Sequence, residues 1–139
     1  MQLKQMMTKG AKTIGADAVL VEAARQMRES DVGALPVVQD GSLCGIVTDR
    51  DITIRATASG RDPNKTAVKD VMTREVFTCP AGSDVGEAVR LMEEKQVRRI
   101  VVTDTNNHPV GVVSLGDIAL DASSERIAAE ALREVSKPD

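Results

Sequence analysis

The sequence is poor in the side chains on which catalysis most often depends. Its 139 residues include one histidine, His108, which lies in the turn-like stretch NNHP. The usual general base of enzymes is therefore missing. The chain also contains no P-loop, no nucleophile elbow, no HExxH and no paired CxxC motif. These absences argue against an enzyme, against a metal site and against a required cofactor.

Cysteine is scarce as well. Cys44 and Cys79 lie in apolar stretches that resemble strands, which favours buried free thiols, with a disulfide or a shared metal as the alternative. With 42% hydrophobic and 28% charged residues, the chain can bury a core without such a crosslink.

The chain lacks both an excess of positive charge and a long hydrophobic run. Its formal net charge is -3 at pH 7, and no basic tail is present, whereas non-specific nucleic-acid binding depends on basic surface. No apolar stretch reaches the roughly 18 residues that span a bilayer, and the start MQLKQMMTKGAK has no signal-peptide core. We therefore expect no nucleic-acid partner, no membrane and a cytoplasmic location.

An internal repeat organises the chain. The dipeptide Met-Thr at 7–8 recurs at 72–73, and eleven positions between 7 and 38 are identical to the residue 65 positions later. Ordinary composition would give roughly two identities in such a window. Further along, GIVTDRD at 45–51 corresponds to GVVSLGD at 111–117, now 66 residues later. The additional residue falls in a turn, where insertions are tolerated.

Both copies predict a helix followed by a hairpin and a second helix. Apolar residues recur at i, i+3, i+4 and i+7, which is typical of an amphipathic helix: Leu20, Ala23, Ala24 and Met27 in the first copy, and Val85, Ala88, Val89 and Met92 in the second. Asp17, and Ser83 or Asp84, are the expected caps of these helices.

The hairpins pair ALPVV with GIVT and RIVVT with GVVS, and a short strand precedes each first helix. Thr48 and Ser114 are placed to cap the second helix of each copy, which opens at the motif aspartate. The fold class is therefore α/β, more narrowly α+β, with two β-α-β-β-α repeats. We assign residues 1–62 to repeat 1 with the start of a linker, 63–122 to repeat 2 and 123–139 to a C-terminal helix or tail.

The duplicated unit, the strand GALPVV and the endings GIVTDRDI and GVVSLGDI resemble a tandem pair of CBS domains, also called a Bateman module. The resemblance covers residues 7–122 and is specific, because the ending motif occurs at corresponding points of two matching repeats. Without an attached enzyme or channel domain, the sequence is similar to stand-alone bacterial CBS-pair proteins. The resemblance implies repeats packed sheet to sheet with pseudo-two-fold symmetry, which leaves two clefts.

The resemblance also implies a regulatory module that binds adenosine-containing ligands, such as AMP, ADP, ATP, NAD or S-adenosylmethionine, in these clefts. A carboxylate can accept two hydrogen bonds from a ribose diol, and a hydroxyl at a helix start can bind phosphate. Asp51 and Asp117 are thus the predicted ribose residues, and Thr48 and Ser114 the predicted phosphate or ribose hydroxyls. A helix cap or first-turn charge is the alternative role of the two aspartates.

By the same resemblance, each cleft takes its aspartate from one repeat and its adenine-facing strand from the other. The Asp51 cleft would use Thr78, Cys79, Val97 and Arg98, and the Asp117 cleft would use Thr13, Ile14, Val32 and Gly33.

The two clefts differ in charge. Arg50, Arg98 and Arg99 belong to the Asp51 cleft, whereas the corresponding positions of the Asp117 cleft hold no arginine. The Asp51 cleft is therefore the predicted phosphate site. A solvated surface or a salt bridge between the repeats is the alternative role of these arginines, and a ligand-independent interaction scaffold with degenerate clefts is the alternative function.

A homodimer is expected. Ile52, Ile54, Ile118 and Leu120 lie on predicted helices with few charges, and the tail SSERIAAEALREV continues at helical spacing. Such a terminal helix needs an apolar surface, either on its own module or on a second subunit. In the CBS family, two modules associate through these helices, so we expect a dimer, with a monomer whose tail folds back as the alternative. A regulated protein is a further expected partner.

Overall fold

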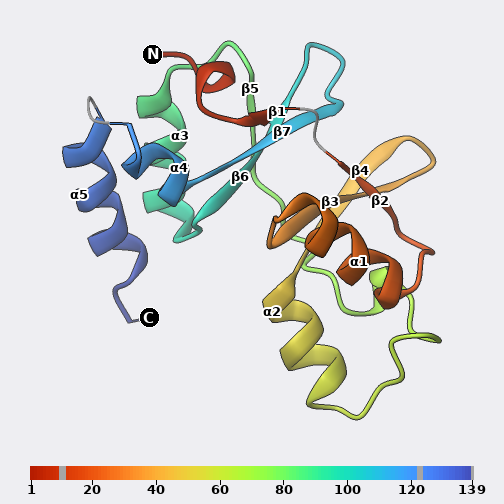
Figure 1. Cartoon of the computed structure of the whole chain (residues 1–139). Coiled ribbons are helices and arrows are strands. Elements are labelled where there is room, and N and C mark those ends of the chain that lie inside the picture. Colours follow the sequence, from red (N-terminus) through yellow and green to blue (C-terminus); the bar gives the residue numbers. More distant parts are fainter. Residues whose placement is uncertain (10–11, 122–123, 139) are drawn as a thin grey trace. The chain divides into compact units, whose positions relative to one another are not determined.

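The computed structural model describes residues 1–9, 12–121 and 124–138 and divides into two compact units (Figure 1). We call residues 12–76 the first-repeat unit, and residues 1–11 together with 77–139 the second-repeat unit. Each unit has a hydrophobic core of its own. The end of the second predicted repeat, at 122, and the start of the predicted tail, at 123, lie outside the described residues.

The first-repeat unit contains a three-stranded sheet in the order β2-β3-β4. Its elements follow the predicted order: β2 (Ile14–Gly15), α1 (Leu20–Ser30), β3 (Ala34–Gln39), β4 (Ser42–Thr48) and α2 (Asp49–Asp51), which continues as the π-helix η2 (Ile52–Thr57). β2 runs parallel to β3, and β3 pairs antiparallel with β4. The tight β3–β4 turn has positive φ at Asp40 and Gly41, as a two-residue hairpin requires.

The second-repeat unit repeats this order and adds a strand and a helix. Its elements are β5 (Thr78–Pro80), α3 (Val85–Lys95), β6 (Arg99–Thr103), β7 (Pro109–Ser114), α4 (Leu115–Ala119) and α5 (Glu125–Val135). Its sheet has the order β1-β7-β6-β5, in which β1 (Thr8–Lys9) comes from the start of the chain. The predicted fold class, with two β-α-β-β-α repeats, is confirmed; the packing of their sheets on each other stays a prediction.

Each repeat gives its first residues to the unit built by the other repeat. We call residues 2–9 and 67–74 the leading segments. The first pairs with the second-repeat unit at Gln2–Asp84 and along β1–β7, and the second pairs with the first-repeat unit at Val19–Ala67 and Ile46–Thr73. Leu3 and Val68, which anchor the two segments, are both fully buried. The compact units therefore do not coincide with the repeats that the sequence displays.

The predicted helix faces are largely confirmed. Leu20, Ala23 and Met27 of α1 are buried, as are all four apolar residues named for α3, whereas Ala24 is exposed. Asp84 caps α3 by accepting a hydrogen bond from Gly86 N at 3.0 Å. The proposed cap Asp17 is wrong: α1 begins after Val19 without a side-chain cap, and Asp17 instead pairs with Lys69 Nζ at 2.7 Å.

The C-terminal helix α5 lies on its own unit, where it contacts α3 and α4. Its residues Ala128 and Ala131 are buried in the core of the second-repeat unit, which supplies the apolar surface that the helix needs. Ile118, which the sequence analysis names on the helices of the expected dimer interface, is instead fully buried in that core. No helix among the described residues is long and apolar enough to cross a membrane.

Candidate functional site

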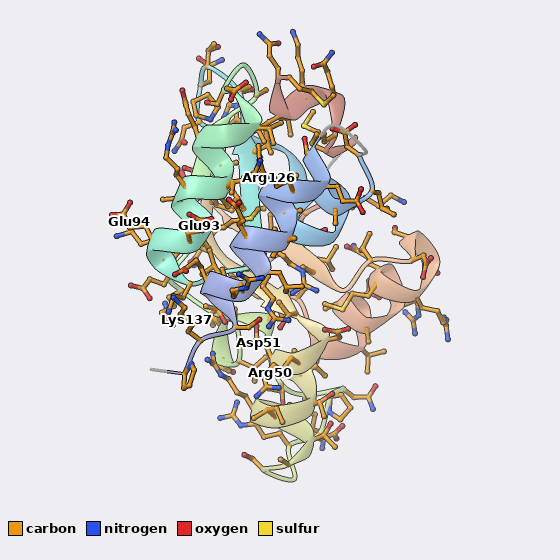
Figure 2. The ribbon with its side chains drawn as sticks, turned by 90° about the vertical axis from the view of Figure 1, so that its left-hand side faces the viewer. Arg50, Asp51, Glu93, Glu94, Arg126 and Lys137 are labelled. Atoms are coloured by element: carbon orange, nitrogen blue, oxygen red, sulfur yellow. The ribbon has the colours of Figure 1, made fainter. Side chains whose placement is uncertain are left out.

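The motif of the first repeat forms a closed hydrogen-bonded turn where β4 enters α2. Thr48 Oγ1 accepts a hydrogen bond from Asp51 N at 3.0 Å, and Asp51 Oδ2 accepts one from Thr48 N at 3.0 Å. This reciprocal capping box satisfies two backbone donors at the helix start. Arg50 and Asp51 occupy neighbouring positions there (Figure 2). The Arg50 side chain is exposed, whereas Asp51 is buried.

The motif of the second repeat has the same local geometry. Ser114 Oγ accepts from Asp117 N at 3.0 Å, and Asp117 Oδ2 accepts from Ser114 N at 2.9 Å. The helix-capping role of both hydroxyls and both aspartates is therefore confirmed. The ligand role predicted for the same side chains stays a prediction, since a carboxylate with one backbone partner retains further acceptor positions.

Asp51 has partners beyond the capping box. Thr73 Oγ1 lies 3.2 Å from each of the two Asp51 carboxylate oxygens, and Arg55 Nη1 lies 3.9 Å from Oδ1. The same Nη1 donates to the carbonyls of Val71 and Met72, at 3.2 and 3.0 Å. The helix that carries the motif thus contacts the leading segment 67–74 through one acidic side chain, Asp51, and one basic side chain, Arg55.

The glycine that opens the motif makes room for this leading segment. A Cβ atom at Gly45 would lie 2.7 Å from Met72 Sδ and 2.9 Å from Thr73 O. The backbones of Ile46 and Thr73 exchange two hydrogen bonds, at 2.9 and 2.8 Å, across the same contact. A glycine in such a motif can serve the close approach of a ligand to the main chain, but at Gly45 the close neighbour is the chain itself.

The predicted adenine-facing residues lie beside the motif of their own repeat. Gly33 O accepts a hydrogen bond from Asp49 N at 3.0 Å, and Arg98 O accepts the equivalent bond from Leu115 N at 2.9 Å. Each unit thus holds one aspartate together with the strand residues assigned to the other cleft. Thr13, Ile14, Val32 and Gly33 are in the first-repeat unit, and Thr78, Cys79, Val97, Arg98 and Arg99 are in the second. The crossed combination stays a prediction.

The predicted phosphate-binding arginines differ in whether their side chains have a partner within the protein. Arg98 Nη2 donates to Ser136 Oγ at 3.1 Å. Arg99 begins β6 opposite Ser114 and is exposed. Neither the Arg50 nor the Arg99 side chain has a hydrogen bond or ion pair with any residue that the structure describes. Both guanidinium groups are therefore available to an anion.

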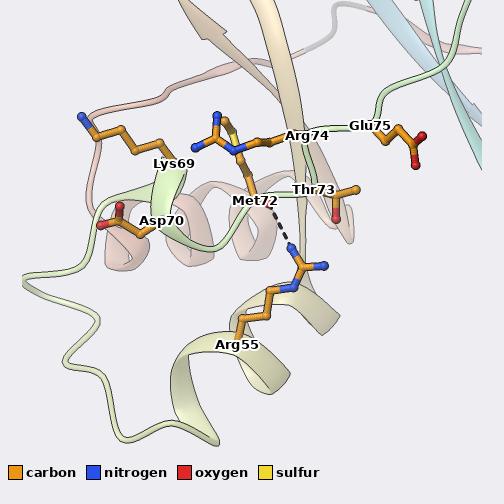
Figure 3. A pocket seen from close by; sticks show the side chains of 7 residues that line it. All are labelled: Arg55, Lys69, Asp70, Met72, Thr73, Arg74 and Glu75. Atoms are coloured by element: carbon orange, nitrogen blue, oxygen red, sulfur yellow. Dashed lines mark hydrogen bonds between the residues drawn. The ribbon is translucent and has the colours of Figure 1, made fainter.

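An open pocket of about 510 Å³ lies in the first-repeat unit beside these contacts (Figure 3). Thr73 and Arg55, which both approach Asp51, are part of its wall. In Figure 3 the Arg55 side chain reaches up to the leading segment, whereas the Glu75 carboxylate points away from it. The lining residues are Arg55, Lys69, Asp70, Met72, Thr73, Arg74 and Glu75.

Sequence reasoning missed Arg55 and Thr73 as neighbours of Asp51. A signal existed for Arg55, because it follows Asp51 by four residues and so lies on the same helix face. Thr73 was recognised only as part of the repeated Met-Thr dipeptide. Its contact with Asp51 depends on the exchange of leading segments between the two units. No local sequence pattern predicts this exchange.

The two cysteines are free thiols, as favoured from the sequence. Burial, with a smaller contribution from Glu87, raises the pKa of the Cys79 thiol, so this predicted adenine-facing group stays protonated at neutral pH. Cys44 Sγ donates to Val37 O at 3.5 Å. Within residues 1–9, 12–121 and 124–138, no three His, Cys, Asp or Glu side chains gather as metal ligands would.

Comparison with known proteins identifies the family. The CBS-domain model matches residues 3–56 and again 68–122, so the chain belongs to the CBS-domain family and carries a pair of these domains. Each match begins in a leading segment. Each of the two CBS domains therefore contributes residues to both compact units.

Two similar proteins match this chain over nearly their whole length. The chain is 40% identical over 134 residues to the CBS domain-containing protein YhcV of Bacillus subtilis, covering 96% of this chain and 94% of that one. The crystal structure of Hypoxic Response Protein I with two coordinated zinc ions is 36% identical, with a TM-score of 0.75 over 86% of this chain and 98% of that one.

One similar structure contains adenosine derivatives. The CBS domain pair of protein MJ0100, in complex with 5′-methylthioadenosine and S-adenosyl-L-methionine, is 28% identical to this chain. Its TM-score is 0.75, and the match covers 86% of this chain and 98% of that one.

Proposed function

We propose that the protein is a regulatory module that senses an adenosine-containing ligand. The observation that carries the proposal is the twofold occurrence of a hydroxyl and an aspartate in one capping box, at Thr48–Asp51 and Ser114–Asp117. The adenosine derivatives bound by the similar MJ0100 pair support the ligand class. The module acts by binding and not by catalysis, and a regulated protein reads its state.

In this proposal the aspartate binds the ribose and the hydroxyl lies near the phosphate or ribose. Each carboxylate has acceptor positions beyond its capping bond, and each hydroxyl keeps its own proton to donate. The adenine base is held by the strand residues of the other repeat, in the crossed arrangement given above. The ligand class comprises AMP, ADP and ATP, with NAD and S-adenosylmethionine as further candidates.

A thermal-shift panel of these ligands on the purified protein tests the proposal. About 23 non-hydrogen atoms in AMP, at about 0.3 kcal/mol each, give a dissociation constant on the order of 10 µM. At 100-fold excess of ligand over this constant, the stabilisation is about 2.7 kcal/mol. D51A and D117A each remove the response of one cleft. Flat melting curves across the panel at millimolar ligand would contradict the proposal.

The arginines distinguish a nucleotide from an uncharged nucleoside. Replacing Arg50 or Arg98 with alanine should weaken AMP binding about tenfold, because a charge-assisted hydrogen bond to phosphate is lost, and should leave adenosine binding nearly unchanged. Titration calorimetry with both ligands measures the difference, and Arg28, exposed on α1, provides a control substitution. Equal weakening of both ligands would remove these arginines from the phosphate site.

A ligand-independent interaction scaffold is the second candidate, and one observation favours it. Both aspartates already satisfy backbone donors of their own helix, and Asp51 also contacts Thr73. These contacts give both aspartates a role in stabilising the fold that does not require a ligand in either cleft. The thermal-shift panel decides between the candidates.

We further propose a homodimer whose interface includes Ile54 and Leu120. These residues occupy corresponding positions of the two repeats, 66 residues apart, and both are exposed, by 51% and 89%. Ile54 lies in η2 and Leu120 directly follows α4, and two equivalent exposed apolar side chains suit a symmetric interface. In multi-angle light scattering, twice the chain mass of 14.8 kDa is expected for the wild type and 14.8 kDa for L120D. A wild-type mass of 14.8 kDa would contradict the dimer.

A further inference from the structure

The Asp51 carboxylate has little free acceptor capacity in the structure. A carboxylate offers about four acceptor positions, two on each oxygen. Oδ2 receives Thr48 N at 3.0 Å and also lies 3.2 Å from Thr73 Oγ1, while Oδ1 lies at the same 3.2 Å from that hydroxyl. The residue is only 7% exposed, so solvent provides few alternative partners.

A ribose diol needs one acceptor position on each carboxylate oxygen. Oδ1 can provide one while Thr73 remains in place, because Arg55 Nη1, at 3.9 Å, directs its hydrogen bonds to two carbonyls instead. The Thr73 hydroxyl has one proton to donate, but because it lies 3.2 Å from both oxygens it occupies the side of the carboxylate that faces both of them, and the capping bond from Thr48 takes a further position on Oδ2. A diol that bridges the two oxygens therefore competes with the Thr73 hydroxyl for this side of the carboxylate, and on Oδ2 no second position is open while Thr73 stays there.

We propose that Thr73 is a specificity-determining residue whose hydroxyl competes with the ribose diol for Asp51, and that it turns away when a ribonucleotide binds. The inference rests on the proposed function, because it takes Asp51 as the ribose residue. It adds a residue from the leading segment of the other repeat, which makes the affinity of this cleft depend on a contact within the first-repeat unit.

The side chain of Thr73 can turn without displacing its segment. The backbone of Thr73 is held by its two hydrogen bonds to Ile46. The two preceding carbonyls are held by Arg55, and Met72 packs on Gly45. A rotation about χ1 between staggered positions is then sufficient to release Oδ2, and Thr73 is half-buried, so its hydroxyl can find water.

Titration calorimetry of the full chain with AMP and 2′-deoxy-AMP tests the inference. Thr73→Val keeps the shape of the side chain and removes its hydroxyl, whereas Thr73→Ser keeps the hydroxyl. T73V should bind AMP about tenfold more tightly than the wild type, since no hydrogen bond to a charged group is displaced. Its affinity for 2′-deoxy-AMP should change less than twofold, because a single ribose hydroxyl can use the free position on Oδ1. T73S should behave as the wild type.

Thr66→Val is the matched control. It removes another threonine hydroxyl of the first-repeat unit, which donates to Asp62 O at 2.7 Å, and should leave both affinities unchanged. Weaker AMP binding by T73V, or equal shifts for both nucleotides, would show that Thr73 only supports the structure and would overturn the inference alone. If the wild type binds neither nucleotide nor any other adenosine derivative, the proposed function fails and this inference fails with it.

Discussion

The two units carry the same motif but secure the opposite repeat's leading segment in different ways. In the first-repeat unit, the segment meets Gly45, Thr73 bonds to Asp51 and Arg55 holds two carbonyls. In the second-repeat unit, the segment forms the strand β1 beside β7, and α5 covers α3 and α4. The residue that corresponds to Arg55 is Asp121, which accepts from Ser124 Oγ at 2.8 Å. Duplication has thus preserved the backbone pairing, while the side-chain partners have diverged.

The largest expected effect comes from Gly45→Ala in the first-repeat unit. The new Cβ would lie 2.7 Å from Met72 Sδ and 2.9 Å from a backbone oxygen, so the leading segment must shift. We expect a loss of about 3 kcal/mol in unfolding free energy, measured by urea denaturation. Gly15→Ala in the same unit, with no atom within 4 Å of its Cβ, is the control. Equal losses in the two variants would mean that the close contact is unimportant.

Alanine substitution of the two motif aspartates compares the units directly. D51A leaves Thr48 N and the Thr73 hydroxyl without their acceptor, whereas D117A removes the acceptor of Ser114 N. We expect about 3 kcal/mol of destabilisation for D51A and about 1 kcal/mol for D117A. Chemical denaturation without ligand measures both values. If D117A destabilises the protein as much as D51A does, the contact between Asp51 and Thr73 adds no stability to the first-repeat unit.

Arg55→Ala tests the clamp in the first-repeat unit, for which the second repeat has an aspartate, Asp121, at the corresponding position. Two hydrogen bonds to carbonyls are lost, but the residue is half exposed and water can replace its donors. The expected cost is about 1 kcal/mol, with faster amide hydrogen exchange at Thr73 than in the wild type. Arg61→Ala, at an exposed position in the same unit, should change neither quantity. Unchanged exchange at Thr73 in R55A would exclude Arg55 as an anchor of the segment.

The smallest expected effect is a pH dependence at Asp84, the cap of α3, for which α1 has no counterpart. The Gly86 N–H and then the N-terminal amine hold the pKa of Asp84 below its ordinary value. A lowered folded-state pKa contributes stability above the ordinary value and loses it as the pH falls through the folded one. Unfolding of D84N and wild type at pH 7 and pH 3 should therefore show a difference that shrinks at pH 3. A difference that persists unchanged would rule out titration of this cap.

Much of the local structure could be predicted because it depends on neighbours in the chain. The spacing of Leu20, Ala23 and Met27 predicts the buried face of α1, and Thr48 and Ser114 cap their helices as expected. Asp17 shows the limit of such reasoning. The helix begins later than the pattern predicts, with Val19 at the cap position, and the Asp17 carboxylate pairs instead with Lys69 Nζ, which is far along the chain, at 2.7 Å.

By itself the sequence determined the duplication, the order of elements in each repeat and the two capping motifs, because repeat identity, hydrophobic period and helix-start chemistry are properties of short stretches. Only the tertiary structure decided that each leading segment joins the opposite unit. This exchange requires backbone pairs such as Ile46–Thr73 between residues that are distant in the chain. It also brings Thr73 against Asp51. The number of hydrogen-bond acceptor positions that stay free on this candidate ribose residue therefore depends on packing between distant parts of the chain, which no local sequence pattern predicts.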